Sequence, residues 1–207
     1  AGAGQATLRY AAPNGGPVFT ITENGLSSIS LGEARVAGGR LACLPCFQME
    51  KFLPVRTKSI TVLSDRAAIV THEYDVATVR CSYALDGEDV VVRVRLENRH
   101  PSETMPFIVV ETPDFARHTI RAQRQTAPRA RHNRRSQAAY VVSETHSIGI
   151  SPDDVGLCNV AAWWAGRQGG LPKDTNPQRA RVKVDMPVRP GSARTATVGI
   201  RVSATAN

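Results

Sequence analysis

Four cysteines carry the most specific chemical signal in the sequence. Cys43 and Cys46 form a Cys-x-x-Cys motif, whereas Cys81 and Cys158 stand alone. Such a motif indicates redox activity in a cytosolic βαβ protein, and two such motifs indicate a zinc site. Because there is no second motif and the pattern is β-rich, we expect two structural disulfides, in one of three pairings, or plain buried thiols. No metal site is expected.

A basic loop at about residues 116–137 is the second candidate site, for binding an anion or contacting another subunit. No Asp or Glu occurs between Asp114 and Glu144. Guanidinium groups bind phosphate and acidic sugars through paired hydrogen bonds, but the loop contains no Phe, Trp or Tyr to stack on bases, which disfavours nucleic acid. A solvated loop, an acidic protein surface and an anionic glycan remain open. The arginines are Arg117, Arg121, Arg124, Arg129, Arg131, Arg134 and Arg135.

Trp163 and Trp164 are the only tryptophans, and they lie among alanines before a Gly-rich segment. Indole faces stack well on the apolar faces of sugar rings, so the pair is a candidate glycan-binding platform. Adjacent residues on a strand point to opposite sides, so at most one of the two is buried while the other is exposed. One core and one interface residue is an equally good interpretation.

Residues capable of acid–base catalysis form no recognisable set. The five histidines include no His-x-His or His-x-x-x-His pair, and His72 shares the parity of Val70 and Tyr74, which predicts a hydrogen-bonded core histidine. A glycosidase needs two carboxylates at a set separation, and the sequence does not show which candidates meet. Those candidates are Glu73, Glu97, Glu111 and Asp114. With no phosphate-binding glycine loop and no nucleophile elbow, we assign no catalytic residue and expect no cofactor.

The composition indicates one folded domain, residues 1–207. Of the 207 residues 42% are hydrophobic, and no apolar run of 18 residues could span a bilayer. The formal net charge is +8, and since four of the 26 basic residues are Lys, 22 are Arg. The opening Ala1-Gly2-Ala3-Gly4 is typical of a chain cut by signal peptidase, so we expect an extracellular or periplasmic location; a trimmed chain is the alternative.

Alternation with a period of two dominates the elements that must position these residues. Apolar residues at 79, 81, 83 and 85 and at 90, 92, 94 and 96 flank Asp86-Gly87-Glu88-Asp89, which predicts a hairpin. Upstream, apolar residues occupy even numbers from 70 to 76, so we expect a bulge or bend near Ala77-Thr78. Further strands are predicted around Phe19–Leu31, with a turn at Asn24-Gly25, and at 6–11, 57–64, 107–111, 139–144, 146–151, 182–188 and 196–202.

Helix signals are weak throughout the chain. The least unfavourable helical turn is at 160–165, before several glycines and Pro172. Many short strands with frequent turn signals favour an all-β fold, an antiparallel β-sandwich or supersandwich in a single domain with little helix.

Three segments resemble galactose-mutarotase-like β-supersandwich domains. Residues 25–32 (GLSSISLG) and 36–39 (VAGG) resemble the opening of those domains. Residues 83–90 (YALDGEDV) continuing to 96–99 (LENR) resemble their central hairpin and the Asn that ends it, and 187–192 (PVRPGS) resembles the turn before their last strand. The resemblance implies a carbohydrate-associated sandwich and, for an enzyme of the family, a histidine acid and a glutamate base across a sugar ring.

This sequence departs from the enzymatic pattern at both catalytic positions. Where the family has an Asn-His pair, the chain reads Asn98-Arg99-His100-Pro101. No convincing glutamate base is found in the last third of the chain, where Asp185 is the only acidic residue after Asp174. General acid–base catalysis needs both groups at a fixed distance from one substrate, so an epimerase is disfavoured.

The hypothesis that follows is a secreted, non-catalytic β-sandwich module that binds or is associated with carbohydrate. Its main alternative is a structural subunit of an extracellular assembly or filament, in which edge strands and the Arg-rich loop contact other copies of the chain or an acidic surface. A mutarotase-like sugar epimerase is the second alternative.

Overall fold

The computed structural model describes residues 4–9, 15–32, 34–38, 44–48, 51–105, 107–111, 114–115, 139–142, 146–152, 158–163, 179–184 and 187–204, with side chains for 4–9, 15–32, 53–105 and 187–202. Within these residues every regular element is a strand, and every strand pairing is antiparallel. The predicted all-β fold class is therefore confirmed.

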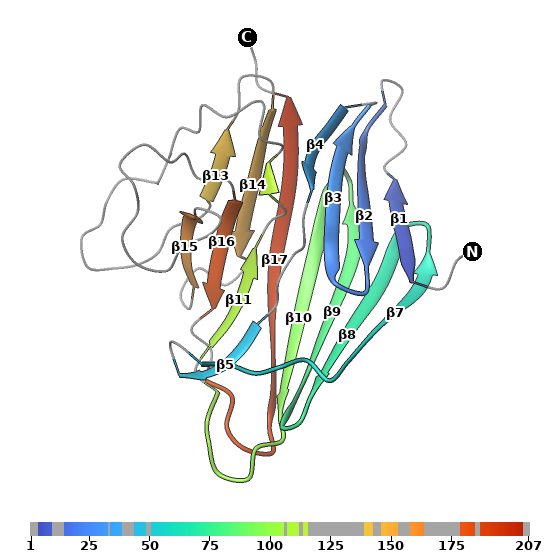
Figure 1. Cartoon of the computed structure of the whole chain (residues 1–207). Coiled ribbons are helices and arrows are strands. Elements are labelled where there is room, and N and C mark those ends of the chain that lie inside the picture. The colour runs from blue at the N-terminus through green and yellow to red at the C-terminus, as the bar shows by residue number, and fades with distance from the viewer. Residues whose placement is uncertain are drawn as a thin grey trace, which may run out of the picture.

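A seven-stranded sheet forms the largest layer and fans across Figure 1. Its strands, in spatial order, are β13 (Ala139–Val142), β14 (His146–Pro152), β17 (Ala193–Ala204), β10 (Asp89–Asn98), β9 (Ala77–Asp86), β8 (Ala67–Tyr74) and β7 (Thr57–Ser64). The central strands are long because their apolar alternation runs unbroken for eight to ten residues.

Two five-stranded sheets accompany it. The first comprises β1 (Gln5–Arg9), β2 (Pro17–Thr22), β3 (Gly25–Leu31), β4 (Ala34–Gly38) and β12 (Asp114–Phe115), and its first four strands lie over β7–β10 in Figure 1. The second comprises β15 (Cys158–Trp163), β16 (Arg179–Val184), β11 (Phe107–Glu111), β5 (Leu44–Gln48) and β6 (Lys51–Phe52). It contacts β13 and β14 through β15 and β16.

The core lies between the seven-stranded sheet and the β1–β4 layer. Alternate residues of β8, β9, β10 and β17 are buried, and they share one hydrophobic cluster with residues of β1, β2 and β3. Complete burial of one such side chain stabilises the fold by about 1.5–3 kcal/mol. The largest completely buried side chains are Tyr74, Tyr83, Phe19, Leu8, Ile21, Leu26, Ile29, Leu96 and Met105.

The structure confirms the central hairpin and corrects the reading of the strand before it. Asp86 pairs with Asp89 across a two-residue turn in which Gly87 has a φ of 58°, a conformation that favours glycine. Of the bulge or bend expected near Ala77-Thr78, the bulge is wrong, because β8 and β9 pair without a register shift; the chain instead reverses at the turn Asp75-Val76. A two-residue turn places its flanking residues, Tyr74 and Ala77, opposite each other, so the buried face changes parity there.

The least unfavourable helical turn, at 160–165, is a strand where the structure describes it. Residues 158–163 form β15, which pairs along its length with β16. Cross-strand hydrogen bonding decides between helix and strand for such short apolar runs, which periodicity cannot resolve. In the described part of the chain, no helix has the length and apolar character needed to cross a membrane.

Candidate functional site

The outer face of β8, β9, β10 and β17, made by the residues that alternate with the core, is polar near the β8–β9 turn and also carries Ile69, Ala84 and Val91 towards its other end. On a strand, successive side chains point to opposite sides, so the core positions of the hairpin leave Thr, Ser, Arg and Glu on the other face. We call this the polar face; it comprises Thr71, Glu73, Thr78, Arg80, Ser82, Arg93, Arg95, Glu97, Thr195 and Thr197.

The strand register brings four of these residues around one hollow. Thr78 lies opposite Glu97, and in the next row Arg80 lies opposite Arg95. The four side chains line a surface hollow of about 340 Å³. Arg93 lies one row further along, opposite Ser82. The hollow therefore presents guanidinium donors, a hydroxyl group and one carboxylate to solvent.

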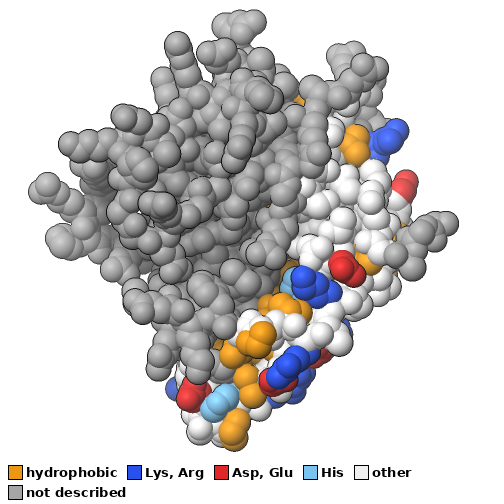
Figure 2. Space-filling model, in the orientation of Figure 1, with side chains coloured by type: hydrophobic (Ala, Val, Ile, Leu, Met, Phe, Trp, Pro, Cys, Tyr) orange, Lys and Arg blue, Asp and Glu red, His pale blue; other side chains and the backbone are white. Residues whose placement is uncertain are grey.

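The two arginines of the hollow form an unusual cross-strand pair. Directly opposite residues have Cβ atoms about 4.5–5.5 Å apart, and like charges at that separation destabilise a sheet. Within the described residues, Arg80, Arg93 and Arg95 make no ion pair, whereas Arg56, Arg99 and Arg201 each do. Figure 2 shows acidic and basic side chains near one another on one face of the described surface, and three ion pairs are formed there, Arg56–Asp75, Arg99–Glu73 and Arg201–Asp89.

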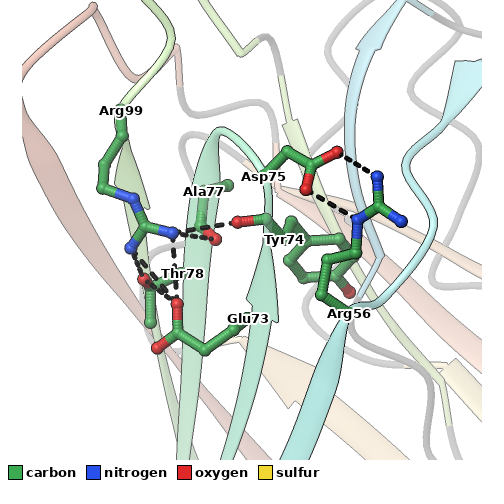
Figure 3. A network of polar contacts seen from close by, with 7 residues as sticks. All are labelled: Arg56, Glu73, Tyr74, Asp75, Ala77, Thr78 and Arg99. Atoms are coloured by element: carbon green, nitrogen blue, oxygen red, sulfur yellow. Dashed lines mark hydrogen bonds and ion pairs between the residues drawn. The ribbon is translucent and has the colours of Figure 1, made fainter.

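Arg99 contacts Thr78, which lines the hollow, and closes the end of the β8–β9 hairpin (Figure 3). Its guanidinium donates to the carbonyl oxygens of Tyr74 at 2.9 Å and Ala77 at 3.2 Å, and forms an ion pair with Glu73 at 3.2 Å. The Thr78 hydroxyl donates to the same Glu73 carboxylate at 2.8 Å and accepts from Arg99. These contacts engage the charge of Glu73 and make Arg99 a structural clamp on the turn.

Arg56 and Asp75 form a second ion pair at the same turn (Figure 3). Two parallel hydrogen bonds, of 2.6 and 2.7 Å, join the Arg56 guanidinium to the two Asp75 oxygens. These hydrogen bonds lower the pKa of Asp75 and raise that of Arg56. Both side chains are mainly exposed, so the pair fixes the turn locally and adds little to global stability.

The Asn98-Arg99-His100 segment, compared above with a catalytic Asn-His pair, is built as a structural corner. Asn98 is completely buried; its Nδ2 donates to the carbonyl oxygens of Glu103 at 2.7 Å and Val188 at 2.8 Å. Its Oδ1 accepts from the His100 amide at 2.8 Å. The Nδ1 of His100 accepts from the amides of Ser102 and Glu103, which leaves the proton of a neutral ring on Nε2.

The remaining sequence-predicted residues are only partly described. His72 is a buried histidine whose Nε2 donates to the Glu23 carbonyl at 2.8 Å, which confirms that prediction. Trp163 ends β15 opposite Arg179, with its side chain outside the described part; Trp164 lies outside the described residues altogether. So do the seven arginines of the 116–137 loop.

The cysteines are described at three of their four positions. Cys81 is a buried, free thiol on β9, which matches the buried-thiol alternative for this residue. Cys46 lies on β5 and Cys158 on β15, both without described side chains, and Cys43 lies outside the described residues. In the described residues no group of three potential metal ligands comes together.

Sequence reasoning missed the hollow, although the signals for it were present. Arg93, Arg95 and Glu97 alternate with apolar residues, which indicates the exposed side of a strand, and the Asp86–Asp89 turn joins this strand to the one before it. Placing the two turn residues at Gly87 and Glu88 would have set Arg80 opposite Arg95. The three-dimensional depression itself has no sequence signal.

No family model and no curated protein matches the chain. A putative aldose 1-epimerase from Escherichia coli K12 superposes with a TM-score of 0.61 at 10% identity, covering 98% of this chain and 100% of that one. For a galactose mutarotase-like protein from Lactobacillus casei ATCC 334 the TM-score is 0.58 at 12% identity, with 97% and 100% covered.

Polysaccharide lyases share the fold over only part of their length. A heparan sulfate lyase mutant from Pedobacter heparinus superposes with a TM-score of 0.61 at 7% identity, covering 99% of this chain and 36% of that one. A second polysaccharide lyase has a TM-score of 0.56 at 13% identity, with 100% and 33% covered. The chain thus spans about a third of each lyase chain. The resemblance predicted from sequence is confirmed for architecture: the chain has a galactose-mutarotase-like β-sandwich fold.

Proposed function

We propose that the chain is a secreted, non-catalytic β-sandwich module that binds carbohydrate on its polar face. The observation that carries this proposal is the solvent-open hollow lined by Thr78, Arg80, Arg95 and Glu97. The fold neighbours support it, because their names describe sugar epimerases and polysaccharide lyases.

The side chains of the hollow suit the hydroxyl groups of a sugar. Arginine presents a rigid fork of donors, and a carboxylate accepts up to four hydrogen bonds, so Arg95 and Glu97 together can engage neighbouring hydroxyl groups. These residues project from long, paired strands, which hold them in fixed positions. Trp163 and Trp164, whose side chains lie outside the described part of the chain, remain candidates for stacking on a sugar ring, and the 116–137 loop for binding an acidic group.

In the described part of the chain the hollow has no matched acid and base, which agrees with a binding role. The hollow contains one carboxylate, Glu97, and no histidine from the described part of the chain. Glu73 lies in the same cross-strand row but is engaged by Arg99 and Thr78. His100, in the segment compared above with the family's Asn-His pair, is not among the described residues that line the hollow, and its Nδ1 accepts two backbone hydrogen bonds.

A glycan array tests the proposal with three proteins. The wild-type chain is expected to bind a saccharide, and Glu97→Ala to weaken that binding. Glu88→Ala is the matched control, because Glu88 is an exposed glutamate in the turn at the far end of the same hairpin. Trp163→Ala and Trp164→Ala measure the stacking contribution separately. No binding to any glycan, or equal binding by the Glu97 and Glu88 variants, would contradict the proposal.

A mutarotase-like epimerase is the second candidate, favoured by the position of Glu97 beside an open hollow. Its test is the rate at which α- and β-anomers of aldoses interconvert, measured by polarimetry with wild-type protein and Glu97→Gln. An accelerated rate that Glu97→Gln abolishes would replace the binding proposal with an enzymatic one.

Assembly through the edge strand β7 is the structural alternative. Val62 and Leu63 on this strand are 53% and 60% exposed, a feature typical of surfaces that contact a partner. However, β7 also carries Lys58 and an irregular pairing between Val62 and Ser64. A charged side chain and a bulge on an edge strand both oppose its pairing with a strand of another molecule. Light scattering at high concentration distinguishes the alternatives: the binding proposal predicts a monomer, and a growing particle mass favours assembly.

A further inference from the structure

The Arg80–Arg95 pair is a charge arrangement that the fold itself does not explain. Both positions face solvent, where threonine or serine would satisfy the strand pattern as it does at Thr71, Ser82 and Thr195. Two guanidinium groups directly opposite one another repel, and the described part of the chain supplies neither of them with an acidic partner.

Two of the three acidic groups near the pair on this face, Glu73 and Asp89, are paired with other arginines. Glu73 is paired with Arg99, and Asp89, at the far end of β10, is paired with Arg201 by two hydrogen bonds of 2.6 and 2.7 Å. Glu97 lies one row from the arginine pair, yet neither Arg80 nor Arg95 forms an ion pair with it in the described structure.

Hydroxyl groups and a third guanidinium surround the pair. Thr71 lies opposite Arg80 on one side, and Thr195 lies opposite Arg95 on the other, so the row reads Thr, Arg, Arg, Thr across four strands. Arg93 is two residues from Arg95 on the same face. This row therefore consists only of side chains that can donate hydrogen bonds to an oxyanion.

We propose that the Arg80–Arg95 pair, supported by Arg93, binds the anionic group of an acidic saccharide, either a carboxylate or a sulfate ester. The saccharide part of this inference rests on the proposed function; the anion part rests on the arginine row alone. Each guanidinium donates two parallel hydrogen bonds to one oxyanion, and the bound charge cancels the repulsion between the arginines.

The position of Glu97 orients the ligand. Its carboxylate borders the hollow one row from the arginine pair, where it repels a second anion and accepts hydrogen bonds from hydroxyl groups. The preferred ligand therefore carries one acidic group with free hydroxyl groups beside it. A densely charged polymer without hydroxyl groups, such as polyphosphate, binds less well.

Titration with inorganic sulfate tests the anion site without any sugar. We expect sulfate to shift the Arg80 and Arg95 Nε–Hε resonances in NMR spectra of the whole chain, with binding that weakens as ionic strength rises. Arg80→Gln and Arg95→Gln are each expected to weaken binding about tenfold. Arg66→Gln is the matched control, because Arg66 is an exposed arginine in the β7–β8 turn. Absence of sulfate binding, or equal weakening by Arg66→Gln, overturns the anion site.

Charge reversal supplies a second readout that does not depend on binding. Arg95→Glu replaces a repulsive pair by an attractive one with Arg80, so it is expected to raise the Tm while abolishing sulfate binding. A lower Tm for Arg95→Glu than for the wild type overturns the claim that the pair is mutually destabilising.

The saccharide arm compares neutral, carboxylated and sulfated oligosaccharides of one backbone and length. We expect the charged forms to bind more tightly than the neutral form, and Arg95→Gln to remove that preference. If the three oligosaccharides bind with equal affinity, and Arg95→Gln does not change that affinity, this inference is overturned but the proposed function is left intact. Sulfate binding without binding of any oligosaccharide overturns the proposed function, and with it the saccharide part of the inference.

Discussion

Replacing Asn98 by Ala is expected to destabilise the fold more than any other single polar truncation near the hollow. Asn98 is completely buried at the end of β10, and its amide joins two segments: the 98–103 corner and the chain around Val188. Its main chain completes the junction, with the amide donating to Ser192 and the carbonyl accepting from Gly191.

The magnitude follows from three lost hydrogen bonds, those to Glu103, Val188 and His100. Each net hydrogen bond is worth about 1 kcal/mol, so Asn98→Ala costs about 3 kcal/mol. The two carbonyl groups that lose the Asn98 amide as a partner carry only a limited desolvation penalty. The Val188 carbonyl still accepts from the Met105 amide at 3.0 Å, and residue 103 is exposed. In a chain of this size the loss lowers the Tm by about 6–12 °C.

Thermal and urea denaturation, followed by circular dichroism, measure this effect. Asn24→Ala is the matched control, because the Asn24 amide oxygen accepts one exposed hydrogen bond from Lys58; its cost is under about 1 kcal/mol. Asn98→Asp keeps the shape but turns two donors into acceptors that face carbonyl oxygens, and it is expected to cost at least as much as Asn98→Ala. The reasoning is refuted if Asn98→Ala and Asn24→Ala lower stability equally.

Three further predictions concern the turn, the core and a glycine. The pKa of Asp75 is lowered in the fold, so its ion pair stabilises the protein above about pH 4 and is lost as the pH falls through the folded pKa. Asp75→Asn should therefore lower the Tm slightly at pH 7, and this difference in Tm should vanish below the folded pKa. A difference in Tm that stays constant with pH would contradict this assignment. Phe19→Ala removes a completely buried ring and should cost about 3–5 kcal/mol in urea denaturation, with a loss under about 1 kcal/mol counting against its place in the core. Gly191 has a φ of 70°, a left-handed conformation that disfavours a residue with a side chain, so Gly191→Ala should lower the free energy of unfolding by about 1–2 kcal/mol. Thermal denaturation measures this loss, and an unchanged Tm would contradict it.

The fold was largely predictable because its main signal is local. The alternation from residue 79 to 96 defines both strands of the central hairpin, and the Asp-Gly turn fixes where they meet. The parity change before Ala77 was detected but assigned to a bulge or bend, because a two-residue turn without glycine has a weaker sequence signature than Asp86-Gly87. Residues 160–163 were ambiguous, and pairing with β16 decides their state.

The site was less predictable because its partners are distant in sequence. The bond from Asn98 to the Val188 carbonyl spans 90 residues, so the sequence does not show which segments the Asn98 side chain joins. Arg80 and Arg95 appeared as ordinary solvated residues of two strands, since their mutual repulsion exists only once the register is set. Arginines are densest along the sequence at 116–137, and this density carries no signal for a pair formed across two strands.

The most direct test of the account is to map where a saccharide binds. Hydrogen–deuterium exchange and amide chemical shifts should be recorded with the tightest-binding oligosaccharide from the array. The account predicts perturbation centred on the outer face of β9 and β10, around Thr78, Arg80, Arg95 and Glu97, and its loss in Arg95→Gln. Saccharide binding that perturbs only β1–β3 or the β7 edge, and leaves this hollow unchanged, would contradict it.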